Sequence, residues 1–329
     1  MSEFDLSFVD RQLAERVSLS MQEVEGALRE SVKSDYPFVT ETSRHLVDAG
    51  GKRFRPLLVL LAAECGKPEM PEVIAAAVVV ELTHLATLYH DDVMDDAALR
   101  RGAASANARW DNTVAILTGD FLFSRASNLL ADLGPEAVRI QARTFERLVV
   151  GQIKETVGPG PADDPVAHYL SVLADKTGSL IATSGRFGAL LSGASPDVVE
   201  LMTSFGEHIG VAFQLADDLL DVSSESADSG KTPGTDLREG IRTLPTLHAL
   251  ASTDPADAEL QQLLQQDLTD DVRHSRTLEL LRESQAMAKA TAELLRYAEE
   301  ARQMLAPLPE GPARSALEGM CDLVVSRNR

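Results

Sequence analysis

Apolar residues recur at helical spacing along almost the whole chain, and Gly or Pro stands at most points where one run ends. Strict alternation of apolar and polar residues, which is typical of strands, is essentially missing. The pattern therefore predicts an all-α fold, with no linker long enough to divide residues 1–329 into more than a single domain. Helices are expected at 9–29, from 37 to the glycines at 50–51, from Pro56 as a first residue, from about 71 into the aspartates at 91–95, at 112–133, 135–157, 165–191, 196–221, 244–250, 256–268 and 278–305, with a polar loop at 223–240.

A cluster of four carboxylates follows the apolar run 73–89, namely Asp91, Asp92, Asp95 and Asp96. Asp91 and Asp95 are four positions apart, so on a helix they point the same way, about one turn from each other. Like charges at this spacing repel, and a hard cation bound through oxygen relieves the repulsion. Mg²⁺ in particular is bound by one or two carboxylates together with substrate phosphates.

The same spacing occurs again in Asp217, Asp218 and Asp221, also at the end of an apolar run. A solvated charged face explains a lone DDxxD motif as well as a metal site does. Such a face would alternate with lysine, however, whereas both clusters have apolar residues directly upstream. We therefore interpret the clusters as two walls of one metal-bridged anion site. Arg100 and Arg101 follow the first cluster, and arginine binds phosphate through two parallel hydrogen bonds.

Composition narrows the class of protein. The 329 residues are 44% hydrophobic and 25% charged, as in an ordinary globular protein. A net charge of −20 argues against nucleic acid or an anionic membrane as a partner. The two cysteines match no metal or redox spacing, and the acidic N-terminus does not resemble a signal peptide. The longest unbroken apolar run has 8 residues, so we expect a cytoplasmic protein with no stable membrane insertion.

Other motifs mostly fail on inspection. Gly230-Lys231-Thr232 looks like the end of a phosphate loop, but Glu225 occupies the required upstream glycine position and no strand precedes it. Neither GxGxxG nor HExxH occurs. His84, near Glu81 on an apolar helix, would usually be a core histidine satisfied by a neighbour. It also lies two turns before Asp91, close to the same face, which places it in the same cavity.

Five motifs stand in order along the chain: GGKRFRP at 50–56, HDDxxD at 90–95, RRG at 100–102, KT at 176–177 and FQxxDDxxD at 213–221. In order and spacing they resemble the (E)-polyprenyl diphosphate synthases, especially long-chain members, of the all-helical isoprenoid synthase fold. The resemblance covers about residues 35–250 and is specific, because so many motifs agree. It implies a single helical bundle around a central cavity, and a homodimer.

The reaction that the resemblance implies is Mg²⁺-dependent head-to-tail condensation of isopentenyl diphosphate with an allylic diphosphate. The allylic substrate ionises, the double bond of isopentenyl diphosphate attacks the carbocation, and a proton leaves, with the departing pyrophosphate as the base. Ionisation is difficult because diphosphate departs with several negative charges, which metal ions stabilise. The absence of a recognisable His/Asp general base is consistent with this chemistry.

Residue roles follow from the same resemblance. Asp91 and Asp95 are expected to hold two Mg²⁺ ions and Asp217 a third, with Asp92, Asp218 and Asp221 supporting. Arg100, Lys176 and Lys231 are expected to bind the allylic diphosphate, and Lys52, Arg55, His84 and Arg101 the diphosphate of isopentenyl diphosphate. Thr177 and Gln214 would face the allylic cation. Each of these residues, taken alone, could have an ordinary structural role as a helix cap, a surface ion pair or a hydrogen-bond partner of a backbone carbonyl. Taken together, they match the motif pattern of the family.

The chain departs from the family pattern at two positions. Many members carry a lysine where Ile241 stands here, and whether Arg242 replaces that phosphate contact is open. Asp111 stands where glycine is common, and we have no account of it.

Product length depends on the residues below Asp91. Ala86 lies about 7.5 Å down the helix, with Thr87 beside it. An aromatic residue there would close the cavity early, so Ala86 predicts a long product, from hexaprenyl to decaprenyl. Deeper residues such as Thr83 and Val79 could still close the cavity, which leaves geranylgeranyl diphosphate as an alternative.

Two other functions compete. A class I terpene cyclase normally mixes Asn, Ser or Thr with Glu in its second site, unlike this chain. A non-catalytic subunit of a heteromeric prenyl synthase would be expected to lose one or both aspartate clusters, and this chain keeps both.

Overall fold

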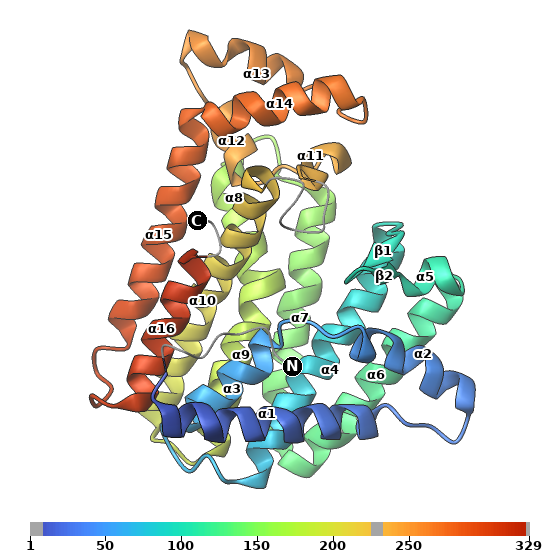
Figure 1. Cartoon of the computed structure of the whole chain (residues 1–329), viewed down its shortest axis with the longest axis vertical. Coiled ribbons are helices and arrows are strands. Elements are labelled where there is room, and N and C mark those ends of the chain that lie inside the picture. The colour runs from blue at the N-terminus through green and yellow to red at the C-terminus, as the bar shows by residue number, and fades with distance from the viewer. Residues whose placement is uncertain (1–8, 225–232, 327–329) are drawn as a thin grey trace. The chain divides into compact units, whose positions relative to one another are not determined.

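The computed structural model describes residues 9–224 and 233–326, and within them the chain is helical almost throughout (Figure 1). The prediction of an all-α fold is confirmed. The elements in order are α1 (Arg11–Ser31), α2 (Pro37–Asp48), α3 (Phe54–Ala63), α4 (Pro71–Met94), β1 (Leu99–Arg100), β2 (Ala103–Ala104), α5 (Ala106–Arg109), α6 (Asn112–Leu133), α7 (Pro135–Val157), α8 (Pro165–Leu173), the π-helical turn η1 (Ala174–Gly178), α9 (Ser179–Leu191), α10 (Pro196–Ser223), α11 (Thr235–Glu239), α12 (Leu244–Leu250), the 3₁₀ turn η2 (Pro255–Asp257), α13 (Ala258–Leu263), α14 (Asp271–Glu283), α15 (Gln285–Met304) and α16 (Pro312–Ser326).

The structure differs from the sequence prediction at several elements; for example, the helix predicted at 256–268 is the turn η2 followed by α13, which ends at Leu263, and α11 lies within the predicted loop at 223–240. α3 begins at Phe54, so Pro56 is its third residue; proline is tolerated there because the first-turn N–H groups have no partner within the helix. The predicted helix at 278–305 is two helices, since the chain is extended at Ser284, whose hydroxyl donates to the Leu281 carbonyl. The short β1–β2 hairpin carries no alternating pattern and was not predicted.

The residues group into two compact units, which are described separately. Unit 1 comprises 1–146, 180–206 and 305–319, and unit 2 comprises 147–179, 207–304 and 320–329. A single domain over residues 1–329 stays a prediction.

In unit 1 the apolar helix α4 packs along α6 and against α3 and α1. Its apolar face explains this position, because Val79, Leu82 and Leu85 are all fully buried. By length and composition α4 could also cross a membrane, but 67% of its apolar window is buried inside the protein, as in a core helix.

Tyr89 ties α4 to α2. Its hydroxyl donates to the Thr42 carbonyl at 2.5 Å and accepts from the Leu46 N–H at 3.3 Å, and the side chain is fully buried. Tyr89 therefore points toward α2.

Replacing Tyr89 by phenylalanine leaves two buried backbone groups without this partner. We expect Tyr89→Phe to lower the free energy of unfolding by about 1–3 kcal/mol, measured by urea denaturation. Tyr297→Phe, on α15 of unit 2, is the matched control and should change stability by less. Equal stability of Tyr89→Phe and wild type would show that the hydroxyl makes no net contribution.

Unit 2 has its own apolar core around α12, which packs against α15 and α8. α14 packs against both α13 and α15. The buried residues of one cluster in this core are Val222, Leu237, Ala249, Leu260, Leu268, Leu278, Leu281 and Ala286. Val222 brings the C-terminal end of α10, which carries the second aspartate cluster, into contact with this core.

Candidate active site

The first aspartate cluster spans the C-terminal end of α4: Asp91 and Asp92 lie in its last turn, and Asp95 and Asp96 directly follow it. The helix ends through two backbone hydrogen bonds, from Ala97 N–H to the Asp92 carbonyl at 2.9 Å and from Asp96 N–H to the Val93 carbonyl at 3.4 Å. Asp96 has a positive φ of 47°, the conformation that this type of helix end requires. The last turn therefore places the carboxylates at the end of the helix, where the backbone dipole is negative.

Carboxylates at this end of a helix are electrostatically unfavourable, because cations are preferred there. α4 has no basic residue in its last turn, and neither has α10, which carries the second cluster. Both clusters thus combine carboxylate charge with the negative end of a dipole. This arrangement favours a bound cation over a solvated surface.

The aspartates of the first cluster differ in environment. Asp95 is exposed and Asp91 half-buried, whereas Asp92 is fully buried. Arg100 Nε donates to Asp92 Oδ1 at 2.6 Å. Burial raises the pKa of Asp92, and Arg100 opposes that effect. Asp91 and Asp95 are thus the accessible oxygen donors, while Asp92 fixes Arg100 beside them.

Three of the four residues predicted for isopentenyl diphosphate lie near one another within unit 1, because the charges of Arg55 and Arg101 both act on His84. Lys52 is exposed and Arg55 half-buried, directly after the glycines at 50–51. Burial lowers the pKa of His84 well below its ordinary value, and the positive charges of Arg55 and Arg101 lower it further. His84 is therefore a neutral hydrogen-bonding group surrounded by cationic side chains, an arrangement suited to a diphosphate.

The lowered pKa of His84 gives a prediction for stability. Unfolding releases the imidazole to its ordinary pKa of 6.5, so the unfolded chain takes up a proton as the pH falls through that value. The contribution of His84 to stability is present above pH 6.5 and is lost below it. We expect His84→Gln to lose less unfolding free energy than wild type between about pH 7.5 and pH 5.5. A steeper loss in the variant would contradict the neutral assignment.

In unit 2, Lys176 and Thr177 lie in the π-helical turn η1, which interrupts the helix predicted at 165–191. Such turns widen a helix locally and occur frequently at functional sites. Lys176 Nζ forms an ion pair with Glu155 of α7. α7 approaches closely at Gly151, where a Cβ atom would lie 2.6 Å from the Lys176 backbone nitrogen.

Thr177 and Gln214 form one hydrogen-bonded chain with the second aspartate cluster. Thr177 Oγ1 donates to Gln214 Oε1 at 3.2 Å, and Gln214 Nε2 donates to Asp218 Oδ1 at 2.8 Å. The Tyr169 hydroxyl donates to Asp218 Oδ2. Burial raises the pKa of Asp218 to about 6, although both hydrogen bonds oppose the shift. Both carboxylate oxygens of Asp218 therefore already accept hydrogen bonds from neighbouring side chains, and Asp217 is the more accessible carboxylate.

Asp221 binds the backbone at 234–236, at the start of α11. Its two oxygens each accept a backbone N–H at 3.1 Å, from Thr235 and from Asp236, and its carbonyl accepts the Gly234 N–H at 2.8 Å. Lys231, the third predicted allylic-diphosphate residue, lies outside the described residues. Ile241 and Arg242 are both exposed, and replacement of the missing lysine by Arg242 stays a prediction.

The donor set fits Mg²⁺. Unit 1 carries the accessible carboxylates of Asp91 and Asp95, and unit 2 carries that of Asp217; carboxylate oxygens are the ligands that Mg²⁺ prefers. Within residues 9–224 and 233–326 no group of three or more His, Cys, Asp or Glu side chains is arranged to hold a metal by itself. One or two carboxylates completed by phosphate oxygens is the usual arrangement for Mg²⁺.

The family model for polyprenyl synthetase matches residues 36–281. The chain belongs to this family. A nonaprenyl diphosphate synthase of Mycobacterium tuberculosis is 48% identical over 97% of this chain and 96% of its own length. A dimethylallyltranstransferase of the same organism is 42% identical over 87% of each chain. A geranylgeranyl pyrophosphate synthase of Corynebacterium glutamicum, solved with calcium and isoprenyl diphosphate, superposes with a TM-score of 0.87 at 46% identity, covering 97% of this chain and 98% of its own.

These comparisons confirm three predictions: the family, the all-α isoprenoid synthase fold and the class of reaction. The protein is a polyprenyl diphosphate synthase, a prenyltransferase that uses isoprenyl diphosphates.

Several residues around the predicted site carry no sequence signal. Tyr169 lies 49 positions from its partner Asp218, and Glu155 lies 21 positions from Lys176. Arg53 lies inside the basic motif, yet it is buried and bound to acidic partners, whereas its neighbours Lys52 and Arg55 are not buried. Arg53 stands between Lys52 and Phe54, and the sequence gives no indication of which cationic side chain of the motif turns inward.

Proposed function

We propose that this synthase elongates an allylic diphosphate with isopentenyl diphosphate to a long all-trans product, between hexaprenyl and decaprenyl. The observation that carries the proposal is the small pair Ala86 and Thr87 on α4, below the aspartates. Ala86 is fully buried and Thr87 half-buried, with the Thr87 hydroxyl donating to the His84 carbonyl at 2.8 Å. No aromatic side chain occupies either position.

The depth of the growing chain has a second candidate limit in unit 1. Thr83, one turn below Thr87, is fully buried and accepts a hydrogen bond from Gln141 Nε2 of α7 at 2.8 Å. A hydrocarbon chain that grew past this depth would have to displace the pair and break its buried hydrogen bond, which is unfavourable. Geranylgeranyl diphosphate is therefore the alternative product. The similarity to a geranylgeranyl pyrophosphate synthase, at 46% identity, favours this alternative, whereas the similarity to a nonaprenyl diphosphate synthase favours the longer product.

In the proposed reaction three Mg²⁺ ions, when bound, neutralise the diphosphate that departs from the allylic substrate. Asp91 and Asp95 hold two of them and Asp217 the third, with Asp92, Asp218 and Asp221 fixing the surrounding backbone and side chains. Arg100, Lys176 and Lys231 bind the allylic diphosphate. The oxygen atoms of Thr177 and Gln214 face the allylic carbons, where their dipoles favour a cation.

The second substrate is bound by cationic residues without a metal. Lys52, Arg55 and Arg101 supply charge, and neutral His84 supplies one N–H donor, so the diphosphate of isopentenyl diphosphate is held while its double bond is free to react. The proton released in the final step passes to the departing pyrophosphate.

We also propose a homodimer that works in the cytoplasm without stable membrane insertion. Large apolar side chains are exposed in each unit, on α6 and the first part of α7 in unit 1 and on the rest of α7 in unit 2, and a second copy would cover such side chains. They are Ile116 and Leu117 of α6, and Val138, Val149, Val150, Ile153 and Val157 of α7, the last at 77% exposure.

Incubation with isopentenyl diphosphate, Mg²⁺ and one primer at a time tests the proposal, with products sized by mass spectrometry. The primers are dimethylallyl, geranyl, farnesyl and geranylgeranyl diphosphate. A product beyond geranylgeranyl is expected. A product that stops at geranylgeranyl would overturn the long-chain assignment alone. Folded protein that elongates no primer would favour a non-catalytic subunit of a heteromeric synthase.

A further inference from the structure

The basic turn at 50–53 has an unusual backbone. Gly50 and Gly51 have φ values of 83° and 132°, and Arg53 has a φ of 50°. A residue with a Cβ atom is strained in this left-handed region. Such a conformation persists only where the surroundings hold it, and strained residues of this kind cluster at ligand sites.

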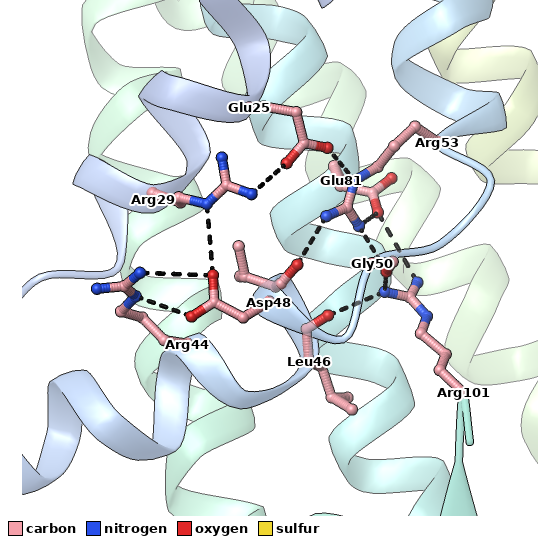
Figure 2. A network of polar contacts seen from close by, with 10 residues as sticks. Glu25, Arg29, Arg44, Leu46, Asp48, Gly50, Arg53, Glu81 and Arg101 are labelled. Atoms are coloured by element: carbon pink, nitrogen blue, oxygen red, sulfur yellow. Dashed lines mark hydrogen bonds and ion pairs between the residues drawn. The ribbon is translucent and has the colours of Figure 1, made fainter. Parts of the chain in front are cut away.

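Buried ion pairs hold Arg53 in this conformation (Figure 2). Its Nη1 donates to Glu81 Oε1 at 2.8 Å and its Nε donates to Glu25 Oε1 at 2.6 Å. Further hydrogen bonds reach the Gly50 carbonyl at 3.1 Å and the Val47 carbonyl at 2.9 Å. The side chains of Arg53 and Glu81 are each only 2% exposed. The charge of Arg53 is therefore neutralised by carboxylates inside the protein and is not available to a ligand.

The same carboxylate lies beside Arg101. Arg101 Nη2 is 3.9 Å from Glu81 Oε1, and Arg101 Nη1 donates to the carbonyls of Leu46 and Gly50 (Figure 2). The guanidinium lies over Gly51, where a Cβ atom would be 2.6 Å from Arg101 Cζ. Arg101 also has a positive φ, of 54°. Two strained arginines, one carboxylate and one glycine thus form a single packed arrangement.

This arrangement determines what the turn presents on its other side. With Arg53 anchored inward, Lys52 is exposed, and Arg55, the second residue of α3, is half-buried. Burial would lower the pKa of Arg53, but Glu81 and Glu25 outweigh it and raise the pKa above the ordinary value. Arg53 thus remains a charged anchor at any pH at which the protein is folded.

We propose that Arg53 and Glu81 are positioning residues of the isopentenyl diphosphate site, which fix the turn and Arg101 in the geometry that binds the diphosphate. This inference rests on the proposed function, because it assumes that Lys52, Arg55 and Arg101 bind that substrate. Neither Arg53 nor Glu81 touches the substrate. Their effect is confined to the affinity for isopentenyl diphosphate.

Steady-state kinetics of four variants test the proposal: Arg53→Met, Glu81→Gln, the double variant Arg53→Met/Glu81→Leu, and Gly51→Ala. Each is expected to raise KM for isopentenyl diphosphate by about tenfold or more, while KM for the allylic substrate changes less than about twofold. Gly51→Ala displaces the Arg101 guanidinium without removing a charge, so it remains informative if the single charge variants fail to fold.

The double variant separates positioning from simple stability. Removing both partners of a buried ion pair often restores stability that removal of one partner costs. We expect its Tm to lie closer to wild type than those of the single variants, with KM for isopentenyl diphosphate still raised. Recovery of both Tm and KM would overturn the proposal. Arg44→Met, which removes an exposed arginine from the outer end of the same network, is the control and should change neither.

Lys52→Ala and Arg55→Ala distinguish failure of this inference from failure of the proposed function. If these two raise KM for isopentenyl diphosphate but the Arg53, Glu81 and Gly51 variants do not, the positioning role is wrong and the site assignment stands. If Lys52→Ala and Arg55→Ala leave KM for isopentenyl diphosphate unchanged, the diphosphate binds elsewhere, and both the site assignment and the positioning role are wrong.

Discussion

Asp91→Asn should reduce kcat by about 10³-fold while leaving the protein at least as stable as wild type. The loss of activity follows from removing a carboxylate that holds the cation opposite the departing diphosphate. The gain or neutrality in stability follows because Asp91 lies at the negative end of the α4 dipole, one turn from Asp95. If Asp91 served mainly to stabilise the fold, Asp91→Asn would instead lower the free energy of unfolding.

Asp96→Asn is the matched control. It makes the same chemical change at an exposed position in the same cluster, and Asn tolerates the positive φ of 47° found there. Activity should remain within about twofold of wild type, since Asp96 caps the helix end and no metal role is assigned to it. Equal losses in Asp91→Asn and Asp96→Asn would show that the cluster acts through its total charge.

Ala86→Phe should shift the product from a long chain to geranylgeranyl diphosphate or shorter, with the first condensation still fast. The aromatic ring would occupy space about 7.5 Å below Asp91, which the growing chain must pass. Products from farnesyl or geranylgeranyl diphosphate, sized by mass spectrometry, measure the shift. An unchanged product distribution would contradict the route along α4.

Because Ala86 is fully buried, the larger side chain also costs about 1–3 kcal/mol of stability by overpacking. Thr87→Phe is the second variant, since Thr87 is only half-buried. Leu88→Phe, half-buried at the next position of the same helix, controls for bulk alone and should leave the product length unchanged.

The helices and both aspartate clusters could be predicted from sequence because their signals are local. Asp91 and Asp95 need only one turn of helix to lie together, and the apolar run before them indicates that helix directly. The break between α14 and α15 at Ser284 could not be predicted, because the apolar residues keep their helical period across it. The pattern alone does not show that the backbone is extended at this residue.

Partners distant in sequence could not be predicted. The hydrogen bond from Tyr169 to Asp218 and that from Gln141 to Thr83 join different helices, and the ion pair from Arg53 to Glu25 joins the turn at 50–53 to α1. Which helix faces which is decided by the packing of the whole unit. The inward turn of Arg53 is one such outcome, since the sequence GGKRFRP offers three cationic side chains of equal rank.

A crystal structure with Mg²⁺, isopentenyl diphosphate and an unreactive thiolo analogue of the allylic diphosphate is the most direct test of the account. We expect metal ions on Asp91, Asp95 and Asp217 that share one diphosphate, and a second diphosphate held by Lys52, Arg55, His84 and Arg101 without a metal. Metal ions bound to only one aspartate cluster, or a metal between the second diphosphate and the basic turn, would contradict it.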